Sequence, residues 1–340
     1  MRPEFFQTLR SPFLWGVILL FFALGFVASP YHLGVATQTM LYISLALAWA
    51  IVGGFAGQLS IAHNVFVAAG ALLASALFLK LGINMWAGMV ICAVLSALIG
   101  VFLAYLDSRF NLGHLSFALV TLAFGEVGVL AVSGWEFVGG ASGLILPSDE
   151  GHFLAFQFGG ARGYYWAALA LATLYLIISF AVLHSRLGFY LRSLRDNEAA
   201  AQAIGVFPFR NKAIAMAISA AMTSVAGTLY ARFSNFVDPS FLASPVLSIE
   251  IILIATIGGL TMPLGPAIAA IVLVPFSELL RGALGGHLPG LSHVIYGVLI
   301  VAVILLSPRG LVPWLAAAIG RMRRKPDNVS LTQSEVSKHE

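Results

Sequence analysis

The chain has 340 residues, of which 60% are hydrophobic and only 9% are charged. Soluble domains usually carry about a quarter of their residues as Asp, Glu, Lys or Arg, so a water-soluble fold is excluded. The apolar runs are long and unbroken, whereas transmembrane strands alternate, so a β-barrel is excluded too. The composition predicts an all-α integral membrane protein surrounded by the lipid bilayer, and the net charge of +4 does not indicate a nucleic-acid partner.

The chain contains ten apolar segments that are candidates for helices. In chain order they cover residues 12–28, 35–53, 61–79, 85–106, 115–133, 163–183, 211–231, 246–259, 264–281 and 291–306. Arg2 and Arg10 precede the first segment as in a signal peptide, but Phe26-Val27-Ala28 is a poor cleavage site. The eighth and ninth segments are short, so they are either two full spans or a broken, re-entrant pair. We expect a polytopic helical bundle of about eight to ten transmembrane helices, built as one transmembrane domain over residues 1–320.

The Lys and Arg residues are distributed unequally between the two sides of these segments. If both termini lie in the cytoplasm, all but four of the 18 fall on the cytoplasmic side. The four on the other side are Lys80, Arg162, Arg232 and Arg281. Because cytoplasmic loops are enriched in Lys and Arg, the pattern predicts an N-in, C-in orientation. Residues 134–162 then form an outer loop, 184–210 an inner loop, and 321–340 a polar cytoplasmic tail that we expect to be disordered.

The inner loop contains a short sequence that suits a protruding helix. Asp196 or Asn197 can cap its start, and Glu198 places a favourable negative charge in its first turn. Alanines of high helix propensity follow, and Gly205 suits the end of the helix. The helix is either a docking surface for another protein or an amphipathic helix on anionic lipid. Docking is favoured because alanines offer little apolar area to lipid.

This loop carries a recognisable motif. Its segment Arg195-Asp196-Asn197-Glu198-Ala199-Ala200-Ala201, followed by Gly205, resembles the coupling-loop motif Glu-x-Ala-Ala-x-x-x-Gly of bacterial ABC importer permeases. The rest of the chain resembles one branch of them, the high-affinity branched-chain amino acid permeases of the LivM type. The similar segments are 53–60 (GGFAGQLS), 117–124 (FALVTLAF), 258–260 (GGL) with 265–266 (GP), and 307–311 (SPRGL). They occur in the family's order and spacing, and the resemblance covers roughly residues 33–312.

The resemblance implies a permease subunit of an ATP-binding-cassette importer in the bacterial inner (plasma) membrane. Such a subunit moves small amino acids, branched-chain ones favoured, by alternating access. The implied partners are a second homologous permease subunit, two cytoplasmic ABC ATPases and a periplasmic or lipid-anchored solute-binding protein. ATP and Mg²⁺ would bind to the ATPases, since this chain has no phosphate loop of its own. We therefore expect a non-enzymatic subunit without a cofactor, catalytic site or metal site.

The resemblance assigns contact with the ATPases to the inner loop. The predicted coupling residues are Arg192, Arg195, Asp196, Glu198, Ala200, Ala201 and Gly205. The chain departs from the family pattern at Ala62, Asn64 and Thr261-Met262-Pro263, which weakens the inference about the substrate. Urea, amides and other small organic solutes are the alternatives. An ATP-independent secondary transporter is less favoured, because coupled carriers usually need several buried carboxylates.

Polar residues at membrane depth are candidates for the translocation path, because an ionisable group there costs about 2.5–3.5 kcal/mol. The candidates are Gln58, Ser60, His63, Asn64, Thr121 and Glu126. The glycines before Gln58 indicate an unwound helix end whose freed backbone groups line a cavity. The alternative is that Ser60 caps a helix while its neighbours form interhelical hydrogen bonds. Glu126 lies between Gly125 and Gly128, which allow close backbone approach. It either forms a wall of the path, or is a carboxyl that lies near the outer interface or bonds to a neighbouring helix.

Overall fold

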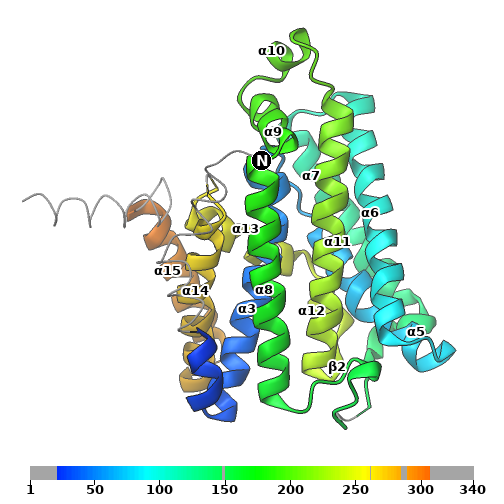
Figure 1. Ribbon diagram of the computed structural model, residues 1–340, viewed down its shortest axis with the longest axis vertical. Coiled ribbons are helices and arrows are strands. Elements are labelled where there is room, and N and C mark those ends of the chain that lie inside the picture. Colours follow the sequence, from blue (N-terminus) through cyan, green and yellow to red (C-terminus); the bar gives the residue numbers. More distant parts are fainter. Residues whose placement is uncertain (1–20, 148–149, 261, 285–288, 307–340) are drawn as a thin grey trace, which may run out of the picture.

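The computed structural model describes residues 21–147, 150–260, 262–284 and 289–306, and it is a helical bundle (Figure 1). Seven helices within these ranges are long and apolar enough to cross a membrane. They are α3 (Pro30–Ala50) with its π-helical continuation η1 (Ile51–Phe55), the run α4 (His63–Ala68), η2 (Ala69–Leu73) and α5 (Ala74–Leu81), α6 (Met85–Phe110), α7 (His114–Gly134), α8 (Ala161–His184), α11 (Pro208–Ser234) and α14 (Leu264–Leu284). The prediction of a polytopic helical membrane protein is confirmed.

The helices differ in how far the bundle encloses them. α3 lies at the centre, packed against α8, α11, α13 and α14, and 89% of its spanning window is buried. The corresponding share is only 28% for α6 and 22% for α7, which are peripheral. α3 is apolar on every side, as a fully enclosed helix must be. The outward faces of α6 and α7 are therefore left for lipid or for another protein.

The eighth predicted segment, 246–259, forms a half-length helix. α13 (Pro245–Gly258) has 14 residues, about 21 Å at 1.5 Å per residue, which is too short for a hydrocarbon layer of about 30 Å. The short helix α12 (Pro239–Leu242) precedes it, and each of the two helices begins with proline, which suits a first helical position. The ninth segment becomes the full-length α14. We expected either two full spans or a broken pair. The first member, α13, is too short to span the membrane, so it follows the broken arrangement.

The two ends of the bundle are built differently (Figure 1). At one end, α9 (Arg186–Asp196) and α10 (Glu198–Ala203) project from the bundle, and we call this the α10 end. The opposite end, here the strand end, carries β1 (Leu144–Ile145) paired antiparallel with β2 (Phe236–Val237). Three 3-10 turns complete the connection from α7 to α8, namely η3 (Glu136–Val138), η4 (Gly140–Ser142) and η5 (Phe153–Ala155).

The connection at the strand end is held down by side chains from two helices. Lys80 Nζ donates to Glu136 O at 2.6 Å, and Trp86 Nε1 donates to Phe153 O at 2.9 Å. The last helix of the described residues, α15 (Pro289–Leu306), packs against α14 and α13. Most of the first predicted segment, the motif at 307–311 and the tail 321–340 lie outside the described residues.

Candidate functional site

The α10 end is shaped by two successive helix caps. Ser185 caps α9, and its Oγ accepts from Gly188 N at 3.3 Å. Asn197 ends α9 in an extended conformation (φ −160°) and caps α10, where its Oδ1 accepts from Ala200 N at 3.0 Å. Of the two predicted caps, Asn197 is therefore the one used. An extended residue between two helices turns the chain sharply, and α10 projects for this reason (Figure 1).

The surface of α10 consists mostly of small side chains. Ala199 and Ala200 are exposed, whereas Ala201 is buried with Leu194 and Val206 in a small apolar cluster. Gly205 follows the helix with a positive φ of 86°, which favours glycine, and it has open space around it. Among the predicted coupling residues, Ala200 and Gly205 thus lie on the surface, while Ala201 fastens the helix to the loop beneath it.

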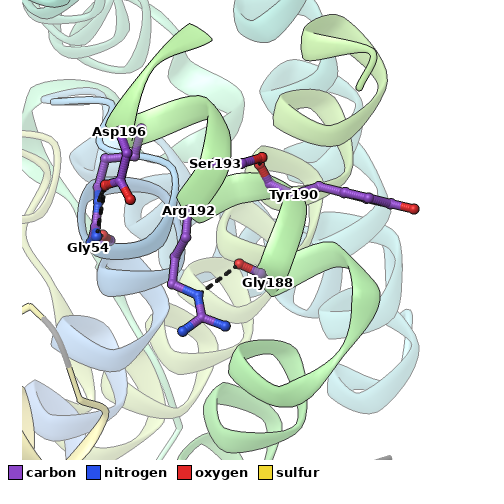
Figure 2. A network of polar contacts seen from close by, with 7 residues as sticks. Gly54, Gly188, Tyr190, Arg192, Ser193 and Asp196 are labelled. Carbon is purple, nitrogen blue, oxygen red and sulfur yellow. Dashed lines mark hydrogen bonds and ion pairs between the residues drawn. The ribbon is translucent and has the colours of Figure 1, made fainter. Parts of the chain in front are cut away.

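Two predicted arginines bond to backbone carbonyl groups beneath the projecting helix, and Figure 2 shows Arg192 directed toward Gly188. Arg195 Nη1 donates to Gly54 O at 2.9 Å, and its Nε and Nη2 donate to Asp196 Oδ1 at 3.2 Å. Arg192 turns toward the end of α8, where its Nε donates to Gly188 O at 3.2 Å and its Nη2 to Leu183 O at 3.4 Å. These arginines of α9 therefore hold the projection to the bundle, Arg192 at the end of α8 and Arg195 at η1.

Glu198 is also bonded within the chain, through two residues that sequence reasoning did not assign to the site. Lys212 Nζ, on α11, donates to Glu198 Oε2 at 2.9 Å and to Asp107 Oδ2, on α6, at 3.0 Å. Gln58 Nε2 donates to the same Asp107 oxygen at 2.7 Å. Asp107 and Lys212 are buried, and each compensates the charge of the other. The sequence did contain a signal for this pair, because Asp107 and Lys212 carry opposite charges and lie at or next to the ends of two apolar segments.

The chain between α3 and α4 is a true break in helical structure. η1 is a π-helix, and residues 56–62 are not helical. Side chains bond the freed backbone groups: Trp49 Nε1 donates to Ser60 O at 2.9 Å, and Ile61 N donates to Thr121 Oγ1 at 3.0 Å. The alternative in which Ser60 caps the next helix is wrong, because Ala62 is the N-cap residue and no side chain caps there. The unwound helix end expected after the glycines is present.

Asn64 joins this break to a second interruption, at the start of α13. Its side-chain amide donates to Ala243 O and to Gly125 O, the latter at 3.4 Å. Its backbone N donates to Ser248 Oγ at 2.7 Å, and Ser248 Oγ donates in turn to Asn64 Oδ1 at 3.1 Å. One asparagine thus holds together α4, α7 and the residues on either side of the α13 N-terminus.

His63 makes the corresponding link to α11. Its Nε2 lies 2.9 Å from Ser219 Oγ, which donates its own proton to Ala48 O at 2.7 Å. Since a serine hydroxyl has one proton, Nε2 of His63 is the donor in this contact. Nδ1 of His63 and Oγ of Ser60 are buried without a hydrogen-bond partner among the described residues.

Five of the six residues predicted for the translocation path therefore cluster around the break. Gln58, Ser60, His63, Asn64 and Thr121 are all 3% exposed or less, so they lie within packed protein in this conformation. Glu126 is apart from them, on the exposed side of α7. Within the described residues no cluster of His, Cys, Asp and Glu could hold a metal ion.

Comparisons with known proteins agree on one family. Residues 31–304 match the family described as branched-chain amino acid transport system / permease component. The high-affinity branched-chain amino acid transport system permease protein LivM of Escherichia coli (strain K12) is 31% identical over 325 residues, which is 88% of this chain and 74% of the relative. LivM of Salmonella typhimurium is 30% identical over the same shares.

A more distant relative is the probable branched-chain amino acid transport permease protein LivM of Methanocaldococcus jannaschii, with 24% identity over 76% of each chain. No solved structure matches the chain. The family match covers most of the chain, including the break between α3 and α4, the α9–α10 projection and α13. This multi-pass membrane protein therefore belongs to the branched-chain amino acid transport system permease family.

Proposed function

We propose that the chain is the permease subunit of an ATP-binding-cassette importer and moves small amino acids, branched-chain ones favoured, by alternating access driven by separate ATPases. The observation that carries this proposal is the attachment of the α9–α10 projection to the break between α3 and α4. Arg195 donates to Gly54 O at 2.9 Å, and Glu198 is linked through Lys212 and Asp107 to Gln58. A force applied to α10 from outside the membrane is thereby delivered to an unwound part of the central helix.

The proposal includes the other subunits of such an importer. Two cytoplasmic ATPases dock on the small side chains of α10 and carry ATP and Mg²⁺, while a solute-binding protein docks at the strand end. We assign the α10 end to the cytoplasm, because the predicted orientation places most of the Lys and Arg residues on that side; both termini are then cytoplasmic, and the chain spans the bacterial inner membrane.

A second, homologous permease covers α7. The spanning window of this helix is only 22% buried, and Glu126 is exposed on it. An ionised carboxylate facing lipid costs about 2.5–3.5 kcal/mol, so contact with a polar path or a polar partner is favoured there. The translocation path then runs between the two permeases past Glu126. The break opens or closes it, and the buried residues Gln58, Ser60, His63, Asn64 and Thr121 set the shape of that break.

The test is purification of the chain from its native membrane with its partners, followed by uptake measurements in proteoliposomes. Co-purifying ATPases, a second permease and ATP-dependent uptake of leucine are the expected results. Uptake of urea or amides in place of leucine would change the substrate assignment and leave the importer class intact. Recovery of the chain alone, active without ATP, would establish a secondary transporter instead.

Deletion of residues 196–205 tests the docking role separately. It removes α10 with its cap and its C-terminal glycine, and leaves every spanning helix in place. Loss of the ATPases from the purified complex is expected. Full transport by the deletion variant would refute docking at α10.

A further inference from the structure

The polar chain Glu198–Lys212–Asp107–Gln58 crosses four separate elements. Glu198 lies on α10, Lys212 on α11, Asp107 on α6 and Gln58 in the break after α3. The three contacts measure 2.9, 3.0 and 2.7 Å, so each is a direct hydrogen bond or ion pair. The chain therefore runs without interruption from the proposed docking helix to the break.

The two middle residues of this series lie on α6 and α11, which pack against each other. A Cβ added to Gly100 of α6 would lie only 2.8 Å from Met216 O of α11, so the two backbones are nearly in contact. Asp107 and Lys212 lie near the ends of these two helices that face α10, and both are buried. The two charges thus move together with α6 and α11.

Glu198, at the outer end of this series of polar contacts, is accessible to a partner protein. The Glu198 side chain is 38% exposed, against 9% for Lys212 and 3% for Asp107. A cavity of about 400 Å³ adjoins the contact and is lined by Gln58, Asp107, Glu198 and Lys212, among others. A partner can therefore reach Glu198, whereas Lys212, Asp107 and Gln58 are buried.

The break receives a second attachment from the same projection. Arg195, three residues before Glu198, donates to Gly54 O at 2.9 Å. Both ends of the segment 54–58 are therefore held, one directly by α9 and the other through the buried ion pair. A displacement of the projection moves the segment as a unit and does not merely pull one end of it.

We propose that Lys212 and Asp107 are positioning residues that carry the movement of α10 to Gln58 and so set the position of the α3–α4 break. This rests on the proposed function, in which partner ATPases move α10. Neither residue contacts solute. Their effect is on how much solute is moved for each ATP hydrolysed, and not on whether the ATPases bind.

The experiment compares uptake per ATP hydrolysed in proteoliposomes that contain the complete complex. The main variant is Asp107→Asn combined with Lys212→Met, which removes both buried charges and leaves only Glu198, whose side chain is 38% exposed, without its cationic partner. The Asp107→Asn change keeps a side-chain oxygen as an acceptor for Gln58. Lys212→Arg is the conservative variant, because arginine keeps the charge and the donors. The matched control is Arg109→Met, which removes an exposed positive charge two residues from Asp107.

The double variant is expected to retain the ATPases through purification and to lower uptake per ATP by about fivefold or more, the range of ordinary site-to-site coupling. Lys212→Arg alone and Arg109→Met alone are each expected to keep the wild-type uptake per ATP hydrolysed. A double variant with the wild-type ratio would overturn the proposal.

A second variant keeps the test decisive if the double variant does not assemble. Gln58→Leu preserves side-chain size and the Lys212–Asp107 ion pair, and removes only the last link. A lowered ratio in Gln58→Leu supports the proposal, and an unchanged ratio overturns it. Failure of the proposed function has a different signature, because the wild-type chain would then show uptake that does not depend on ATP.

Discussion

The contact between Gly57 and Arg195 allows a quantitative test of how the projection is held. A Cβ at Gly57 would lie 2.4 Å from Arg195 Cγ, so Gly57→Ala has to displace the arginine side chain. It also places a non-glycine residue at φ +70°, and a left-handed conformation of this kind costs about 1–2 kcal/mol. Displacement breaks the hydrogen bond from Arg195 to Gly54 O, which is worth about 1.5–3 kcal/mol for a charged donor. Gly57→Ala should therefore cost about 2.5–5 kcal/mol in the free energy of unfolding.

The prediction is checked with a double-mutant cycle, measured by equilibrium unfolding of the purified chain in mixed micelles. In an Arg195→Ala background the clash with Cγ is absent and only the Cβ at 3.2 Å remains, so Gly57→Ala should cost little more than the conformational part, about 1–2 kcal/mol. Gly82→Ala is the control, because Gly82 has a similar φ of +65° with open space around it. Its cost should be the same with or without Arg195. Additive effects of Gly57→Ala and Arg195→Ala would refute the reasoning.

Three further predictions concern the site and its packing. Asn64→Leu removes the polar contacts that join the two helix interruptions, so it should lower stability by about 2–4 kcal/mol, measured by the same unfolding assay; an effect below about 1 kcal/mol would contradict the bridging role. Gly70→Ala places a Cβ 1.8 Å from Ser224 O, so it should prevent purification of folded protein, whereas Gly34→Ala, which meets open space, should be tolerated. Glu126→Leu should leave the unfolding midpoint of the isolated chain unchanged yet lower uptake by the complex; unchanged uptake would place Glu126 outside the path.

The cluster around the break shows how far sequence reasoning reached into the site. The glycines before Gln58 indicated an unwound segment, and the polar residues after it were correctly grouped there. Their bonding partners, Ser219 and Ser248, lie 156 and 184 residues away in the chain from His63 and Asn64. Serine is common in apolar helices and gives no local signal of which contact it makes. The Lys212–Asp107 pair was missed for the same reason, since pairing across 105 residues requires the helix packing to be known.

The sequence by itself determined that the chain is a helical membrane protein, where most of its helices run, and that a short helix capped by Asp196 or Asn197 follows. These properties depend on composition and on contacts within a few residues, which are readable locally. The tertiary structure alone decided that α13 is a half-length helix whose start lies beside the α3–α4 break. It also decided that Arg192 and Arg195 bond to the bundle and that Glu126 faces away from the polar cluster. Each of these depends on which helices are neighbours and how they are rotated, and an apolar helix with little amphipathic character carries no record of its rotation in its own residues.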